Sequence, residues 1–220
     1  MNLRDRHEAV EERIQRAVQR CGRKREDITL VAVTKLFPAD VLVQAYELGM
    51  LDFGENYVQE FAAKLPHLSR LTEARFHLIG HLQSNKARTA SDLFHVIQTV
   101  DSAKLARRLA AVGKPLEIMI EVKLSEEESK SGAPPEALSG IAGALREFPH
   151  LRLTGLMTMP PWSEDPERSR AYFSPLRELA EEHRLPHLSM GMSHDFEVAI
   201  EEGATHIRVG TALFGRRKKA

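Results

Sequence analysis

Cysteine is nearly absent from this sequence: Cys21 is the only one in 220 residues, so no internal disulfide can form. A lone thiol is usual in the reducing cytosol. Long apolar runs are also missing, because the longest stretch without Asp, Glu, Lys or Arg, residues 153–163, is shorter than the about 20 residues of a membrane helix. Residues 1–13 are charged throughout and lack the apolar segment of a signal peptide. These absences predict a soluble cytoplasmic protein without a membrane partner.

A net charge of one sign is missing as well. Lysine plus arginine equals aspartate plus glutamate at 31 each, so no overall field attracts nucleic acid. The basic tail at 216–219 is typical of a solvated terminus. The ten histidines show no metal-ligand spacing: His77 and His81 are four apart, but Gly80 between them indicates a strand-to-loop segment instead of a helix. We expect neither nucleic acid nor a metal as partner.

What the sequence does contain is a regular alternation of short apolar runs with helical patterns. The runs, which predict strands, cover residues 28–34, 51–53, 76–79, 94–99, 116–122, 153–158, 187–190 and 205–209. Helical patterns fall between them, most clearly over 55–65, 101–112, 134–147, 163–183 and 193–202, with Asp101 and Ser193 as expected N-caps. Strict alternation of this kind requires parallel strands joined by crossover helices.

Eight such units predict a (β/α)8 TIM barrel formed as a single domain by residues 1–220. A further helical pattern, 3–21, precedes the first strand, and we expect it to fill the outer ring because the tail after the last strand, 210–220, is too short for a full helix. The alternative is an open doubly wound sheet. That fold carries a glycine-rich turn after its first strand, whereas this chain has Thr-Lys-Leu-Phe at 34–37.

The strongest candidate site follows strands seven and eight. Barrels carry their sites at the C-terminal ends of the strands, and phosphate often binds there between the last two loops. Gly191 and Gly210 allow close backbone approach, while Ser193 and Thr211 offer hydroxyls beside the helix expected to begin at 193. Taken singly, Ser193 is explained as a helix cap and Gly210 as a strand end. Taken together, the two neighbouring loops favour a phosphate site.

Lys35 directly follows the first strand and is the second candidate. Its ammonium can simply reach solvent, but a lysine facing a phosphate site suggests a Schiff base with a carbonyl substrate or with pyridoxal phosphate. Arg208 suits the pyridine nitrogen of pyridoxal phosphate, and a salt bridge inside the barrel is the alternative. Ser193, His194 and Asp195 are consecutive and cannot fold back into a hydrolase triad. His81 is interpreted as a structural hydrogen-bonding residue, with a proton donor or a pocket-lining residue as the alternatives.

Six segments in chain order carry a family resemblance. They are VAVTK at 31–35, FGENY at 53–57, HLIGHLQSNK at 77–86, GLM at 155–157, LSMGMS at 188–193 and VGTALFG at 209–215. With these segments the sequence resembles the pyridoxal phosphate homeostasis protein family, single-domain relatives of the barrel domain of alanine racemase. The resemblance covers nearly the whole chain.

The resemblance implies a cofactor site for pyridoxal 5'-phosphate. Its residues would be the imine-forming Lys35, Arg208 at the pyridine nitrogen, the phosphate ligands Ser193, Gly210 and Thr211, Asn56 near the ring hydroxyl, and Met190 and Gly191 at the pocket border. It also implies a cytoplasmic monomer that carries or buffers the cofactor as a lysine Schiff base and passes it to apo-enzymes. Such a protein helps to maintain vitamin B6 and amino-acid homeostasis, without an assigned catalytic turnover.

Two other functions stay open at this point. One is a pyridoxal-phosphate-dependent racemase-like enzyme, and the other is a lysine Schiff-base aldolase acting on a sugar phosphate. Colour separates the aldolase, because a sugar imine lacks the conjugated chromophore of a pyridoxal imine. Lys130, in the loop after the fifth strand, is the rival to Lys35 as the reactive amine.

Overall fold

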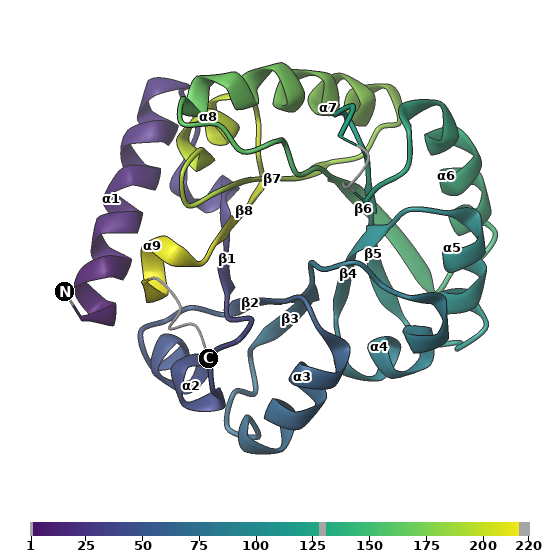
Figure 1. Ribbon diagram of the computed structural model, residues 1–220, viewed down its shortest axis with the longest axis horizontal. Coiled ribbons are helices and arrows are strands. Elements are labelled where there is room, and N and C mark those ends of the chain that lie inside the picture. The colour runs from purple at the N-terminus through teal and green to yellow at the C-terminus, as the bar shows by residue number, and fades with distance from the viewer. Residues whose placement is uncertain (1, 128–130, 216–220) are drawn as a thin grey trace.

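The computed structural model describes residues 2–127 and 131–215, in which eight parallel strands form a closed barrel (Figure 1). The strands pair in chain order, and β8 closes the barrel by pairing with β1. They are β1 (Thr29–Val33), β2 (Asp52–Glu55), β3 (Arg75–Leu78), β4 (Val96–Val100), β5 (Leu116–Glu121), β6 (Leu151–Met157), β7 (His187–Met192) and β8 (His206–Val209). The predicted (β/α)8 fold is confirmed.

Helices surround the barrel as an outer ring (Figure 1). They are α1 (Leu3–Arg20), α2 (Ala39–Glu47), α3 (Val58–Lys64), α4 (Ala87–Leu93), α5 (Ala103–Ala110), α6 (Leu138–Arg146), α7 (Arg170–Glu182), α8 (Phe196–Glu201) and α9 (Thr211–Phe214). Each strand-to-strand connection carries one of them, as parallel pairing requires. No helix of the described ranges is long and apolar enough to cross a membrane.

The first helix completes the ring, as predicted. Helix α9 has only four residues, so it leaves the outer surface of β8 and β1 uncovered. Helix α1 packs against α8 and α9 there, lying between α8 and α2 in Figure 1. Its buried face consists of Val10, Ile14, Ala17 and Val18, and a capping box between Asn2 and Asp5 begins it.

Two predicted helix starts were wrong. Helix α8 begins at Phe196 with Asp195 at its N-cap, because Asp195 accepts a hydrogen bond from the Met192 backbone and draws 192–195 into a turn. Helix α5 is capped by Ser102 instead of Asp101, since the Ser102 hydroxyl accepts from the Leu105 backbone N–H. Position 193 therefore lies in a turn before a helix, not inside one.

Alternate side chains of each strand face the helices and the barrel interior. Outward residues such as Leu30, Ala32 and Met190 join the buried helix residues in one apolar core. The interior is partly polar, and it contains buried His77, Gln98, Ser189, His206 and Arg208. Burying polar atoms costs free energy unless they form hydrogen bonds with one another. The hydrogen bonds of these residues therefore bear on the structure of the site.

Candidate functional site

A cavity of about 230 Å³ opens at the C-terminal ends of the strands. Its walls come from the ends of β1, β7 and β8, the segments that follow β1, β2, β3, β6 and β7, and the start of α9. Six of the eight predicted site residues line it: Lys35, Asn56, Ser193, Arg208, Gly210 and Thr211. Barrel closure therefore brings together residues from both ends of the sequence.

The other two predicted residues, Met190 and Gly191, are not among the described lining residues. Ser189 faces the interior, where its hydroxyl accepts a hydrogen bond from Arg208, so Met190 faces the helices and is fully buried in the apolar core. Gly191 has φ +88°, and a Cβ there would lie 2.5 Å from the Ala199 Cβ. Gly191 thus lets the β7 end pack closely against α8.

Ser193 joins the loops that follow β7 and β8. Its hydroxyl accepts hydrogen bonds from the backbone N–H groups of Gly210 at 3.3 Å and Ala212 at 3.2 Å. The turn around it is held by Asp195, whose carboxylate accepts from the Met192 backbone and the Ser169 hydroxyl, each at 2.7 Å. The neighbouring-loop arrangement was predicted, whereas the helix N-terminus expected at Ser193 is replaced by this turn.

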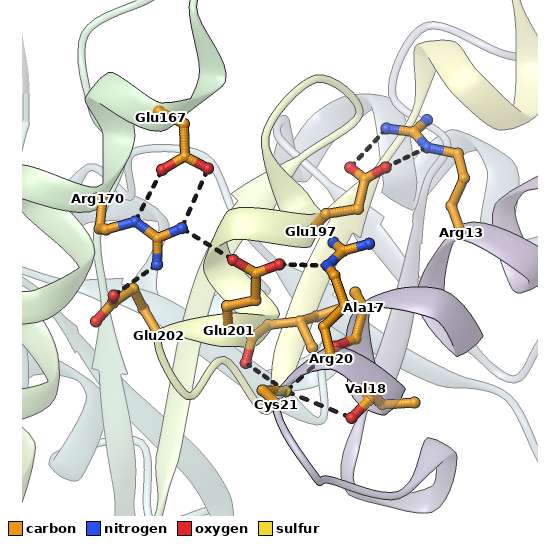
Figure 2. Close-up of polar contacts among 11 residues, drawn as sticks. Arg13, Ala17, Val18, Arg20, Cys21, Glu167, Arg170, Glu197, Glu201 and Glu202 are labelled. Atoms are coloured by element: carbon orange, nitrogen blue, oxygen red, sulfur yellow. Dashed lines mark hydrogen bonds and ion pairs between the residues drawn. The ribbon is translucent and has the colours of Figure 1, made fainter.

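Helix α1 also holds this turn. Arg13 donates two hydrogen bonds of 2.7 Å to Glu197 of α8 and one of 3.2 Å to the Ser193 carbonyl. Its guanidinium lies over the Phe196 ring, 4.2 Å from the centroid. Figure 2 shows the Arg13–Glu197 pair beside a second ion pair, in which Arg20 of α1 contacts Glu201 of α8. Helix α1 therefore shapes the site as well as filling the ring.

Arg208 places a buried positive charge at the cavity. It is 3% exposed, and it donates to the Ser189 hydroxyl at 2.7 Å and the Thr158 carbonyl at 2.9 Å. Burial lowers the pKa of Arg208 to about 10, with the carboxylates of Glu121 and Asp195 acting in the opposite direction. The guanidinium is therefore still charged at neutral pH.

The turn that carries Lys35 is held in place by side chains of helix α3. Leu36 has φ +64°, a strained conformation for a branched side chain, and its N–H donates to the Glu60 carboxylate at 2.6 Å. Buried Lys64 pairs with Glu60 at 2.6 Å and donates to the Thr34 carbonyl at 3.0 Å. Lys35 thus lies between two backbone positions that the same ion pair holds.

Sequence reasoning missed this supporting cluster and its buried carboxylate, Glu55. Glu55 accepts from Lys64 and from the Thr34 hydroxyl, each at 2.8 Å. Burial raises the pKa of Glu55 even though these hydrogen bonds oppose the change. A signal was present, because Glu60 and Lys64 are spaced i,i+4 on one helix.

The loop after β6 was also missed as a cavity wall. Met159, Pro161, Trp162 and Ser163 line the cavity. Trp162 is 74% exposed and stacks on the His194 ring with centroids 6.3 Å apart. The position of this loop at the end of a strand was the signal in the sequence that it borders the cavity. Its prolines pointed the other way, because proline-rich loops commonly serve only as connections.

Asn56 presents an unsatisfied group at the cavity. Its side-chain oxygen is buried and has no hydrogen-bond partner among the described residues. The backbone is held tightly there, because a Cβ on Gly80 would lie 2.4 Å from the Asn56 carbonyl oxygen. A buried polar atom of this kind normally has a partner, and here it borders the space that a ligand would fill.

The remaining predictions concern His81, Lys130, the basic tail and metal binding. His81 is 53% exposed, and its Nδ1 lies 3.6 Å from the Asp101 carboxylate. Lys130 and the basic tail lie outside the described residues. The part of the chain that the structure describes holds no group of three or more His, Cys, Asp or Glu side chains able to bind a metal ion.

Comparison with known proteins shows the class of protein to which this chain is similar. Residues 6–218 match the family of the alanine racemase N-terminal domain, in agreement with the barrel fold. The pyridoxal phosphate homeostasis protein of Aquifex aeolicus is 43% identical, over 99% of this chain and 100% of that protein. The Escherichia coli K12 protein of the same name is 41% identical, over 94% of each chain.

A solved structure agrees with these matches. PipY of Synechococcus elongatus PCC7942 with PLP bound has a TM-score of 0.81 and 37% identity, covering 92% of this chain and 100% of that one. The chain belongs to the pyridoxal phosphate homeostasis protein family. The family resemblance inferred from the six segments is thereby confirmed.

Proposed function

We propose that this protein binds pyridoxal 5'-phosphate in the cavity and carries or buffers it as a Schiff base with Lys35. One observation carries the proposal: a single cavity presents a primary amine, a buried guanidinium and two hydroxyls, from Lys35, Arg208, Ser193 and Thr211. The names of the relatives and the PLP-bound PipY structure support it. Apo-enzymes that need the cofactor are the proposed recipients, and vitamin B6 and amino-acid homeostasis in the cytoplasm is the proposed role of a monomeric carrier.

The donor set fits an anionic ring compound. Asp195 is the one carboxylate among the described lining residues, and both of its oxygens already accept hydrogen bonds from the protein. The cationic side chains of Lys35 and Arg208 outnumber this one carboxylate, so the charge of the described lining favours a phosphate. The volume of about 230 Å³ is below the ~300–1,000 Å³ of drug-sized sites, which suits a small single-ring molecule. The unpartnered Asn56 amide oxygen adds a polar group for that ring.

The residues would divide the binding between them. Pyridoxal phosphate supplies an aldehyde that condenses with a primary amine, and Lys35 is the amine in position. Ser193, Thr211 and the Gly210 backbone would hold the phosphate. Arg208 would face the ring nitrogen, and because it keeps its own proton it would leave that nitrogen unprotonated and the ring a weak electron sink. That electronic state suits a carrier better than a racemase.

The test of this proposal is the absorption spectrum and covalent trapping of the protein as purified. We expect a yellow protein, fixation of the cofactor by borohydride on the peptide that contains Lys35, and loss of fixation in Lys35→Ala. Lys104→Ala, on the exposed start of α5, is the control and should be trapped like the wild type. A reduced adduct mapped to Lys130 or another lysine would contradict the assignment of Lys35.

A further inference from the structure

A continuous chain of hydrogen bonds crosses the barrel interior behind the cavity. Arg208 Nη1 donates to Ser189 Oγ at 2.7 Å, and Ser189 Oγ lies 2.6 Å from Gln98 Oε1. Gln98 Nε2 lies 3.0 Å from His77 Nδ1, and His77 Nε2 lies 2.8 Å from Asp52 Oδ1. The five residues come from β8, β7, β4, β3 and β2, and all except Asp52 are buried.

The chemistry of the groups sets one direction for the whole chain. A guanidinium only donates, so the Ser189 hydroxyl accepts from Arg208 and gives its own proton to the Gln98 oxygen. The Gln98 amide nitrogen then donates to His77 Nδ1, which must carry a lone pair. His77 therefore holds its proton on Nε2 and donates it to the Asp52 carboxylate.

The reverse orientation of the Gln98 amide is unfavourable. It would direct the amide nitrogen at Ser189, and the Ser189 proton would lose the acceptor it has in this structure. It would also require a proton on His77 Nδ1, which makes the ring a second buried cation in the same interior as Arg208. A single proton on Nε2 satisfies every contact of the chain, so the Nε2–H tautomer of His77 is the consistent solution.

A cation at one end and a carboxylate at the other polarise the groups between them. Dipoles aligned head to tail strengthen each other in a low-dielectric interior. An apolar residue at position 98 would instead leave both the Ser189 proton and His77 Nδ1 without partners. The interior also contains the apolar side chains of Val31 and Met119, which pack there without hydrogen-bond partners. Polar residues are therefore not needed merely to fill the barrel.

We propose that Gln98 and His77 are positioning residues for Arg208, which they hold through Ser189 in the orientation that faces the ring of the cofactor. This inference rests on the proposed function for the ligand, whereas the direction of the chain rests on the protein alone. Neither Gln98 nor His77 lines the cavity. They act on the ligand only through the guanidinium.

The first test needs no ligand. Nitrogen-15 NMR of the His77 ring is expected to show the neutral Nε2–H tautomer in the wild type. In Gln98→Glu the new carboxylate can only accept, so His77 should become doubly protonated between two carboxylates. A wild-type His77 with its proton on Nδ1, or with protons on both nitrogens, would overturn the proposed direction.

The second test measures the effect on the site. Gln98→Met should weaken pyridoxal phosphate binding about ten-fold and shift the absorption maximum of the bound cofactor, because the Ser189 hydroxyl loses the acceptor that orients it toward Arg208, which leaves the Thr158 carbonyl as the fixed contact of the guanidinium. Thr154→Val removes another buried barrel hydrogen bond, from Thr154 to the Ile118 carbonyl, and should leave both readouts unchanged. If Gln98→Met does not fold, Ser189→Ala breaks the chain at its contact with Arg208.

The outcomes separate the two proposals. Equal affinity and spectra in wild type and Gln98→Met, or equal losses in Gln98→Met and Thr154→Val, would overturn the positioning role. If no variant, the wild type included, binds pyridoxal phosphate, the proposed function fails while the NMR result still decides the direction of the chain.

Discussion

At the scale of single residues, the cavity brings together a small number of side chains, each of which supplies a different chemical group. Lys35 supplies an amine, Arg208 a charge, and Ser193 and Thr211 hydroxyls. Ser193 is held by two backbone N–H groups, so its oxygen position is set before any ligand binds. Such preorganisation reduces the entropy that binding must overcome. The predictions at this scale concern those hydroxyls and one buried histidine.

Removing both hydroxyls should weaken cofactor binding strongly. Each hydrogen bond to a charged group is worth roughly 1.5–3 kcal/mol, so Ser193→Ala with Thr211→Val should reduce pyridoxal phosphate affinity by about two orders of magnitude or more. Titration followed by absorbance measures the effect. Ser139→Ala, on the exposed face of α6, is the matched control and should bind normally. Affinity within a few-fold of wild type in the double variant would place the phosphate elsewhere.

His206 should make the fold less stable in mild acid. Burial lowers the pKa of His206 to about 3, below its ordinary value of 6.5, because desolvation disfavours the charged imidazolium. As pH falls from 6.5 toward 3, the unfolded chain takes up a proton that the folded chain refuses. The free energy of unfolding therefore decreases with falling pH, by up to about 1.4 kcal/mol per pH unit from this group.

Urea denaturation at pH values from 7 to 4 checks this slope. His206→Gln should reduce it, whereas His67→Gln, which changes an exposed histidine, should not. An unchanged slope in His206→Gln would show that other groups cause the acid sensitivity.

At the scale of elements, α1 links the outer ring to the cavity. Its ion pairs with α8 come from two arginines that differ in one respect: Arg13 also donates to the Ser193 carbonyl, while Arg20 pairs with Glu201 away from the turn (Figure 2). Arg170 adds contacts with Glu201 and Glu202 from the α7 side. Helix α8 is therefore held on both sides by guanidinium groups.

Arg13→Gln should weaken cofactor binding as well as the fold. The pair with Glu197 is partly exposed, so we expect about 1 kcal/mol of lost stability, and an affinity loss of about five-fold if that energy acts on the Ser193 turn. Arg20→Gln is the matched control, since it removes an α1–α8 ion pair without touching Ser193. Denaturation and absorbance titration of both variants give the comparison. Equal affinities in the two variants would show that α1 does not act on the site.

At the scale of the whole molecule, the proposed function places a ring and a phosphate in the cavity at the strand ends, with Arg208 as the proposed cationic partner of the ring nitrogen. A protonated arginine there disfavours the carbanion chemistry of a racemase. We expect α-proton exchange of alanine in deuterated water, followed by NMR, to be slower than about 1 s⁻¹, the low end of typical enzyme turnover. Faster exchange, lost in Lys35→Ala, would promote the racemase-like alternative.

Much of this protein follows from local sequence pattern. Period-two and period-3.6 apolar spacing depend on neighbours within a few residues, so the eight strands and the extra helix α1 were predictable. Lys35 and Gly210 were recognisable for the same reason, because each directly follows a strand that ends at the site. Met190 was placed at the pocket border although strand alternation turns it toward the helices.

The remaining features depend on barrel closure and register. Gln98 meets Ser189 across 91 positions of sequence, and Arg13 meets Ser193 across 180. No local pattern specifies such pairs, since the same polar side chains are compatible with solvent until the strands close around them. The sequence by itself determined the barrel and which residues stand at its strand ends. Only the tertiary structure decided which buried polar groups pair and in which direction. A hydrogen-bond donor that is shielded from water has to pair with the acceptor that the packing places beside it.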